Sequence, residues 1–510
     1  MRSADRVIGV AKRNEFNAKL PCLWHLGIEK MNRLGMMCVS ANTHGHTKRF
    51  IAMKHSRKSV ERKAHAIPHI KFEQQQLTSF AGLVLLPPFL AAIGFKASLG
   101  RCFRHVRTGK IYGRATIFLQ LIIHLLLGYR DLRESAYYRD DPMVKRVLGL
   151  KRLPDVATLS RMLKDADQQS IERLRHLLRR LVLDRLRELA LARVTLDFDG
   201  SVQSTTRRAE GTAVGFNKKK KGARSYYPLF CTIAQTLQVL DFLHRSGNVH
   251  DSRGAREFIA ECIGLIREAL PTAVIEVRAD SAFFSDELVT VLRGHRVEFT
   301  VSVPFERFVE LKGMIEGRRR WRRFDADRSC FERLWKPKCW EQAYRFVFVR
   351  TRAKRQQKWP VQLDLFVPYE YGCEFKVIIT NKRVGVGTVL RFHEGRGAQE
   401  GIFGELKTHC AMGHVPVRRR LGNQMYLLAG LFAHNLVREL QMRTAKQSRG
   451  TTDNRAALWM FEQVDTVRKT LLQRAGRLTS PSGKLTLTIS GAGVVKEKLL
   501  GMLDLLRPAA

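Results

Sequence analysis

The sequence predicts an α/β catalytic core that is preceded by an all-α region and interrupted by a mostly β insertion. Three observations indicate this fold class. Apolar residues recur every three or four positions between about residues 69 and 190, a spacing typical of packed helices. From about residue 193 the spacing falls to two, as in strands, with one helical stretch, EFIAECIGLIREAL, between two strand-like runs. A long β-rich stretch then precedes the next helical segment, RGAQEGIFGELK.

The region from 69 to 190 contains three strongly periodic helical segments: IFLQLIIHLLLGY, LPDVATLSRML and SIERLRHLLRRLVLDRLREL. The last segment has many arginines on its polar face, which would suit either a DNA-facing surface or the solvated face of a packed helix. The longest apolar stretches, at 82–95 and 115–129, are shorter than the roughly 20 residues that a bilayer span needs. We therefore expect a helical DNA-binding region with buried helices, and no membrane partner.

The strand-like run VTLDFDGSV begins the first part of the predicted core, at 191–300. Its apolar residues alternate with polar ones, which places Asp197 and Asp199 on the same face. YYPLFCTIAQTLQVLDFLHRSGN predicts two more strands, and AVIEVRAD predicts another after the intervening helix. This order is that of a ribonuclease H-like domain, in which the first and fourth strands bring their acids together. We expect the second part of the core at 386–445.

About 120 residues separate the end of AVIEVRAD from the helical segment RGAQEGIFGELK, far more than one crossover connection needs. The intervening sequence has several strand-like runs, so we predict a mostly β insertion at 301–385. Its segment RRRWRRF offers Arg319 and Arg322 for backbone phosphates, and Trp321 for stacking on an unpaired base. Alternatively, Trp321 and the other tryptophans of the insertion fill its small core.

Three carboxylates lie at the ends of predicted elements. Asp199 and Asp280 each close a strand-like run, and Glu400 lies in the helical segment RGAQEGIFGELK. An aspartate at a strand end projects from a rigid backbone, so two neighbouring strands could hold divalent cations, with a helix glutamate completing the site. Hard oxygen ligands of this kind suit Mg²⁺, with Mn²⁺ as a substitute. We therefore predict a two-ion site and a metal-assisted phosphodiester enzyme.

Each carboxylate also has an alternative interpretation. Asp280 could cap the helix that follows it, because aspartate is favoured at such positions. Asp197 is expected to tune the site as a neighbour of Asp199 rather than to bind metal itself. Glu405 competes with Glu400, but its five-residue offset turns it well around the helix.

The net charge indicates a polyanionic partner. The chain has 90 Lys and Arg against 47 Asp and Glu, a formal charge of +43 over 510 residues, and such a surface attracts nucleic acid. The lysine run is expected to contact backbone phosphates, although lysines in loops are more often only solvated; its members are Lys218, Lys219, Lys220 and Lys221. Nine scattered cysteines without a Cys-x-x-Cys pair favour a reducing cytoplasm. We expect residues 1–68 to be a basic, poorly ordered extension and residues 446–510 a tail with helix and strand.

One set of spacings resembles a known family. The chain reads His393, two residues, Arg396, three residues, Glu400, six residues, Lys407. This resembles the Tyr, Arg, Glu, Lys signature of the DDE transposases of bacterial insertion sequences, of the DDE domain group 1 type, with histidine where tyrosine is usual. LDFDGSV and RADSAFFSDEL resemble the two aspartate motifs of that family, and the similarity runs from about 69 to 500.

The resemblance implies that the three carboxylates are catalytic and bind two Mg²⁺ ions, and that Arg396, Lys407 and His393 contact DNA. It implies double-stranded DNA as the partner, both terminal inverted repeats and target, with at least a dimer in the complex and the bacterial nucleoid as the location. The implied reaction is strand cleavage at the element's ends, followed by attack of the 3′-hydroxyl on target DNA. Two alternatives stay open: another ribonuclease H-like nuclease, and a catalytically inactive, transposase-derived DNA-binding protein.

Overall fold

Every helix and strand named below belongs to the unit Glu73–Ala510. The predicted extension at 1–68 lies almost entirely outside the described residues, and so do Lys218 and Lys219. The computed structural model describes residues 67, 69–73, 75–107, 109, 111–215, 217, 220–250, 253–352, 373–450, 456–491 and 493–506.

A short strand, β1 (Leu77–Thr78), precedes a series of helices and two 3₁₀ turns at Ala81–Leu85 and Leu132–Tyr138. Pro87 and Pro88 lie in the first turn of the first helix, where a missing backbone N–H removes no helical hydrogen bond. The longest helix of this series begins after Asp167, whose carboxylate accepts a hydrogen bond from the backbone N–H of Ser170 at 2.7 Å. The helices are α2 (Leu86–Ala92), α3 (Phe95–Cys102), α4 (Arg114–Leu126), α5 (Pro142–Leu148), α6 (Val156–Lys164) and α7 (Gln168–Leu189).

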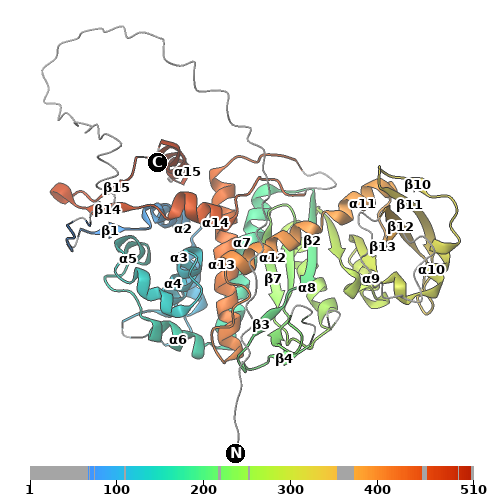
Figure 1. Ribbon diagram of the computed structural model, residues 1–510, viewed down its shortest axis with the longest axis horizontal. Helices are drawn as coiled ribbons and strands as arrows, with labels where there is room; N and C mark the ends of the chain where they lie inside the picture. Colours follow the sequence, from blue (N-terminus) through green and yellow to red (C-terminus); the bar gives the residue numbers. More distant parts are fainter. Residues whose placement is uncertain are drawn as a thin grey trace, which may run out of the picture. The chain divides into compact units, whose positions relative to one another are not determined.

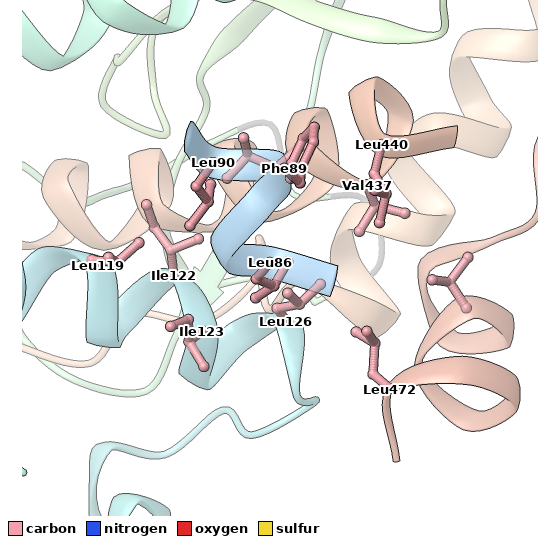
Figure 2. A pocket seen from close by; sticks show the side chains of 12 residues that line it. Leu86, Phe89, Leu90, Leu119, Ile122, Ile123, Leu126, Val437, Leu440 and Leu472 are labelled. Carbon is pink, nitrogen blue, oxygen red and sulfur yellow. The ribbon is translucent and has the colours of Figure 1, made fainter. Parts of the chain in front are cut away.

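The core of this helical region is completed by α13 (Arg420–Thr444), a helix from the C-terminal part of the chain (Figure 1). Nearly every residue in its central turns is buried, and it packs against α4, α6 and α7. Figure 2 shows apolar side chains of α2, α4 and α13 directed toward one another, and the void that they leave is only about 20 Å³. Such close packing is that of a protein interior rather than a ligand pocket.

By length and composition, none of the described helices could cross a bilayer alone; the bent pair Ala81–Ala92 and Phe95–Cys102 meets those two criteria only when taken together.

Nine strands of the described chain form one mixed sheet, in the order β10-β11-β12-β13-β9-β8-β2-β6-β7. The pairs β2–β8 and β8–β9 are parallel, and the other neighbours are antiparallel. The prediction of an α/β fold is therefore confirmed. The strands are β2 (Arg193–Gly200), β6 (Leu229–Ile233), β7 (Gln238–Leu243), β8 (Val274–Ala279), β9 (Glu298–Val303), β10 (Arg322–Arg323), β11 (Arg328–Trp335), β12 (Tyr344–Arg352) and β13 (Cys373–Thr380).

The parallel pairing of β2 with β8 depends on the crossover helix α8 (Ala255–Ala269). Its apolar side chains recur at helical spacing and are buried against the sheet. The alternation expected for β2 is present, but its polar face is not open to solvent, because Thr195 and Asp197 are buried. Thr195 donates a hydrogen bond to Glu276 Oε2 at 2.8 Å. This face is exposed only at the two ends of the strand, at Arg193 and, in part, at Asp199.

The strands of the expected insertion extend the main sheet rather than forming a sheet of their own. β13 pairs antiparallel with β9, and β12, β11 and β10 follow outward (Figure 1). Their aromatic side chains contact one another: the rings of Trp335 and Phe346 are 5.0 Å apart, and those of Trp340 and Phe284 are 5.1 Å apart. These tryptophans fill a core, which is the second of the two interpretations that the sequence allowed.

The remaining elements flank the sheet or join the helical region. Two small three-stranded sheets have the orders β3-β5-β4 and β1-β14-β15 among the described residues. Their strands are β3 (Gln203–Thr205), β4 (Ala213–Val214), β5 (Arg224–Tyr226), β14 (Gly476–Thr479) and β15 (Thr486–Ile489). The other helices are α9 (Asp286–Gly294), α10 (Val309–Glu316), α11 (Val386–Glu394), α12 (Gly397–His409), α14 (Val464–Val467) and α15 (Gly493–Leu506).

Mild acid is expected to destabilise this fold. Burial lowers the pKa of His124 and His434 to about 4 and that of His244 to about 3, so all three are neutral when folded at pH 7. In the unfolded chain a histidine has a pKa of about 6.5 and takes up a proton below that pH. Stability should therefore be full above about pH 6.5 and fall as the pH drops toward 4, by about 1–2 kcal/mol per histidine at pH 5.

Urea denaturation at pH 7 and pH 5 measures this effect. Replacing the exposed His176 by alanine is the control and should leave the pH dependence unchanged. Equal stabilities of the wild-type chain at the two pH values would show that the buried histidines do not behave in this way.

Candidate active site

Asp199 is the last residue but one of β2, and Asp280 directly follows β8, the neighbouring parallel strand. The partners Phe198 and Ala279 lie in register, so the two aspartates come next on adjacent strands at the same sheet edge. Asp199 Oδ1 accepts a hydrogen bond from the N–H of Gly200 at 2.7 Å. Parallel pairing thus brings together two acids that are far apart in the sequence.

Asp280 also acts as a cap. Its Oδ1 accepts a hydrogen bond from the N–H of Ala282 at 2.9 Å and so begins the 3₁₀ turn Ser281–Phe283. The capping role considered for Asp280 is therefore present, although for a shorter turn than the expected helix. A cap of this kind fixes the orientation of the carboxylate at the strand end.

Arg396 links the first aspartate to the helical glutamate. It directly precedes α12, and its Nη1 is 3.2 Å from Asp199 Oδ2, whereas its Nη2 is 3.9 Å from Glu400 Oε1. The side chains of Arg396 and Asp199 are each 19% exposed, but that of Glu400 is 70% exposed. A guanidinium between two carboxylates offsets their repulsion, and Glu400 remains on the open face of α12.

The chemistry of this donor set suits a hard divalent cation. Two carboxylates come from rigid, neighbouring strand ends, and a third comes from the first turn of a helix whose N-terminus is bonded to one of them. In the described part of the chain, no group of three His, Cys, Asp or Glu side chains lies close enough together to hold a metal ion. In this arrangement Arg396 supplies the positive charge between Asp199 and Glu400.

Asp197 is buried and forms an ion pair. Arg278 donates to its two oxygens at 2.6 and 2.7 Å, and burial raises the pKa of Asp197 while Arg278 acts in the opposite direction. Arg278 Nη1 also donates to the carbonyl of Phe392 at 2.9 Å, and Gln399 Nε2 donates to the carbonyl of Asp197 at 2.9 Å. The pair therefore fastens the α11–α12 segment, which carries Glu400, to the sheet.

The close approach of this segment requires a glycine. A Cβ on Gly395 would lie 2.2 Å from Arg278 Nη1, so a larger residue would displace the guanidinium. Arg278 and Gly395 were not singled out in the sequence. Their local signal was an arginine two residues before Asp280 in AVIEVRAD and a glycine directly before the Arg-x-x-x-Glu spacing.

His393 does not lie where a DNA contact requires it, which corrects the expectation from its place in the signature. It is 1% exposed on α11, between Ser302 Oγ at 2.9 Å and Thr300 Oγ1 at 2.9 Å, both on β9. Burial and the nearby cations Lys376 and Arg396 lower its pKa well below the usual value. A buried, neutral histidine of this kind holds α11 against the sheet.

The predicted phosphate contacts have different environments. Lys220 and Lys221 are exposed in a turn, and Lys407 is exposed on α12. Arg319 and Arg322 are exposed as well.

Trp321, in contrast, is packed into the protein. Its ring is 4.7 Å from that of Phe331, edge to face, and the guanidinium of Arg350 lies 4.8 Å from its centroid. The ring is therefore partly buried among protein side chains, and its stacking on a base stays a prediction.

Three of the six arginines of α7 form ion pairs with buried acids, which neither interpretation of this helix anticipated. Arg175 and Arg179 both donate to the buried carboxylate of Asp241 on β7. Arg185 pairs with Glu439 of α13 at 2.6 Å. These ion pairs bind α7 to the sheet on one side and to α13 on the other.

A second set of buried charges holds α12 at its C-terminal half. Glu405 Oε2 accepts a hydrogen bond from Arg438 of α13, and Glu405 Oε1 accepts one from the N–H of Val464 at 2.8 Å. Arg468 Nη2 donates to the carbonyl of His409, at the end of α12, at 2.7 Å. Glu405, considered as a competitor of Glu400, thus fixes the helix that presents Glu400.

The comparisons with known proteins agree with the motifs. The sequence matches the family described as transposase DDE domain group 1 over residues 62–510. Among solved structures, the chain is similar to a piggyBac transposase synaptic complex with hairpin DNA, with 11% identity, 84% of this chain and 85% of that chain covered, and a TM-score of 0.40. The chain has no significant match among curated proteins. From its family match, which spans most of its length, the chain belongs to the transposase DDE domain group 1 family.

Proposed function

We propose that this chain is a DNA transposase that binds the terminal inverted repeats of its element, cleaves DNA there and joins the freed 3′-hydroxyl to target DNA. The observation that carries the proposal is the position of Asp199 and Asp280 at neighbouring parallel strand ends, with Arg396 linking Asp199 to Glu400. The strand order β7-β6-β2-β8-β9, antiparallel as far as β2 and parallel from there, supports a ribonuclease H-like core.

The proposed chemistry assigns a task to each side chain. Two bound Mg²⁺ ions would polarise the scissile phosphate and neutralise the charge that develops in the transition state. Asp199 and Asp280 would hold them from strand ends, and Glu400 from the first turn of α12. Arg396 and Lys407 would bind phosphates of the DNA end on either side of the scissile bond, because both lie on the same side of α12 as Glu400.

The exposed face of α12 suits the close approach of a polyanion. Gly397, Gly401 and Gly404 lie on this face beside Glu400 and Lys407, and a Cβ on any of the three would meet nothing within 4 Å. A glycine inside a helix costs about 0.5–1 kcal/mol relative to alanine, and packing against the described residues does not explain that cost here. A DNA backbone lying along this face would make use of it.

The proposal is tested with the purified chain and linear DNA that carries the flanks of its reading frame, in Mg²⁺ or Mn²⁺. We expect strand cleavage at one defined position in each flank, followed by joining of the new 3′ end to a second duplex. A dimer on the DNA is expected, since two ends must be joined in one complex.

Two outcomes would overturn the proposal. Metal-dependent cleavage without preference for the flanks, and without joining, would indicate a ribonuclease H-like nuclease of another kind. Specific binding to the flanks without cleavage in either metal would indicate a DNA-binding protein that has lost its activity.

A further inference from the structure

A hollow of about 290 Å³ lies between α3 and α7. Its polar lining consists of three arginines, a histidine, a hydroxyl and a thiol. None of the described residues that line it is an aspartate or glutamate. The lining residues that matter here are Ser98, Arg101, Cys102, Arg173, His176 and Arg180. The arginines of α7 were visible in the sequence, but their position beside Arg101 and Cys102 was not, because α3 and α7 are far apart in the chain.

The three guanidiniums lie close enough to act on one buried thiol. Burial raises the pKa of Cys102 to about 11, while Arg180, Arg173 and Arg101 each act to lower it. Arg101 Nη2 donates to Ser98 Oγ at 2.8 Å, and Arg173 Nη1 lies 3.0 Å from His105 Nδ1. Two of the three arginines are therefore oriented by contacts to a hydroxyl and to an imidazole nitrogen.

The acids nearest to this hollow already have partners. An adjoining hollow shares Arg101 and Arg180 and is also lined by acids. Asp184 is 2.7 Å from Arg187, and Glu188 is 2.7 Å from Arg185. The third acid, Glu439, is bound by Arg185 and by Arg443.

The positive charge around Arg101, Arg173 and Arg180 is therefore a local surplus. Arg180 is exposed and has no acidic partner among the described residues, unlike Arg175, Arg179 and Arg185 on the same helix. A planar guanidinium binds phosphate oxygens in a bidentate manner, so an exposed guanidinium without an acidic partner is available to an anion.

We propose that this hollow binds backbone phosphates of double-stranded DNA, as a contact additional to the carboxylates at the ends of β2 and β8. The proposal rests on the function proposed above and names one surface of the helical region that the DNA uses. The net charge of +43 makes a polyanion the partner that fits the surplus. Because the contact is to phosphates, it carries no base preference of its own.

The test is the salt dependence of binding to a fluorescent duplex, measured by anisotropy between 50 and 300 mM salt. The wild-type chain is compared with Arg180→Glu, an exposed change, and with the double variant Arg101→Ala/Arg180→Ala. Each phosphate contact that is lost should reduce the slope of log K against log salt by about 0.9, so the double variant should lose about 1–2 units of slope.

Arg256→Glu is the matched control. Arg256 is an exposed arginine on α8 that pairs with Glu257 at 2.7 Å, so this change lowers the net charge by two, as each hollow variant does, without touching the hollow. We expect its slope to remain that of the wild type. Circular dichroism and urea denaturation confirm that each variant is folded.

The outcomes separate this inference from the proposed function. Unchanged slopes for both hollow variants, with DNA cleavage intact in the wild type, would show that the hollow does not bind DNA phosphates. The transposase proposal would then be unaffected. Equal losses of slope in the hollow variants and in Arg256→Glu would assign the effect to net charge and would also contradict DNA binding at the hollow. If the wild-type chain neither binds nor cleaves duplex DNA, the proposed function itself is wrong.

Discussion

Asp199→Asn and Asp280→Asn are each expected to reduce strand cleavage at least about a thousand-fold, equivalent to about 4 kcal/mol of transition-state stabilisation, while leaving DNA binding intact. Asparagine has the shape of aspartate but no charge, and a neutral amide is a poor ligand for Mg²⁺ compared with a carboxylate. Asp199 also carries the contact to Arg396 at 3.2 Å, so its loss should release Arg396 from the strand end. Asp280 keeps a capping oxygen as asparagine, which preserves the turn that follows it.

Cleavage of a duplex with defined ends and binding to the same duplex are both measured. Glu400→Gln belongs to the same series and should behave alike. Glu287→Gln is the matched control, because Glu287 is an exposed acid only a few residues beyond Asp280, in the first turn of α9. Full cleavage by any one of the three variants would remove that residue from the catalytic set, and an equal loss in the control would point to general charge effects.

Glu405→Ala is expected to destabilise the protein by about 3–5 kcal/mol, the largest effect on stability that we predict for a single charge. Arg438 is 3% exposed, and burial lowers its pKa, so without Glu405 its guanidinium would remain buried with no opposite charge. The backbone N–H of Val464 would also lose its acceptor. Breaking a buried ion pair from one side costs more than the pair itself contributes.

Urea denaturation of a double-mutant cycle measures this prediction. Glu405→Met/Arg438→Met replaces both charges by side chains of similar volume and should recover much of the lost stability. Glu400→Gln, on the same helix but 70% exposed, is the control and should change stability by less than about 0.5 kcal/mol. A loss below about 1 kcal/mol for Glu405→Ala would show that the pair does not anchor α12 in the way that we infer.

The local periodicity of the sequence predicted much of the fold. The alternation in β2, the helical spacing in α8 and the aspartates that close two strands are all short-range patterns, and each formed the expected element. The parallel pairing of β2 with β8 follows from a strand, a crossover helix and a strand. The position of Asp199 and Asp280 at one sheet edge was therefore already specified by residue order.

The tertiary structure decided what lies opposite each face, because a partner far along the chain leaves no local signal. α13 completes the core of the helical region, and β13 joins the insertion to the main sheet. The same cause explains the side chains whose environment was not predicted. A polar residue on one face of an element is solvated, bound to DNA or ion-paired according to what packs there. Arg179 pairs with Asp241, Glu405 pairs with Arg438, and His393 contacts β9.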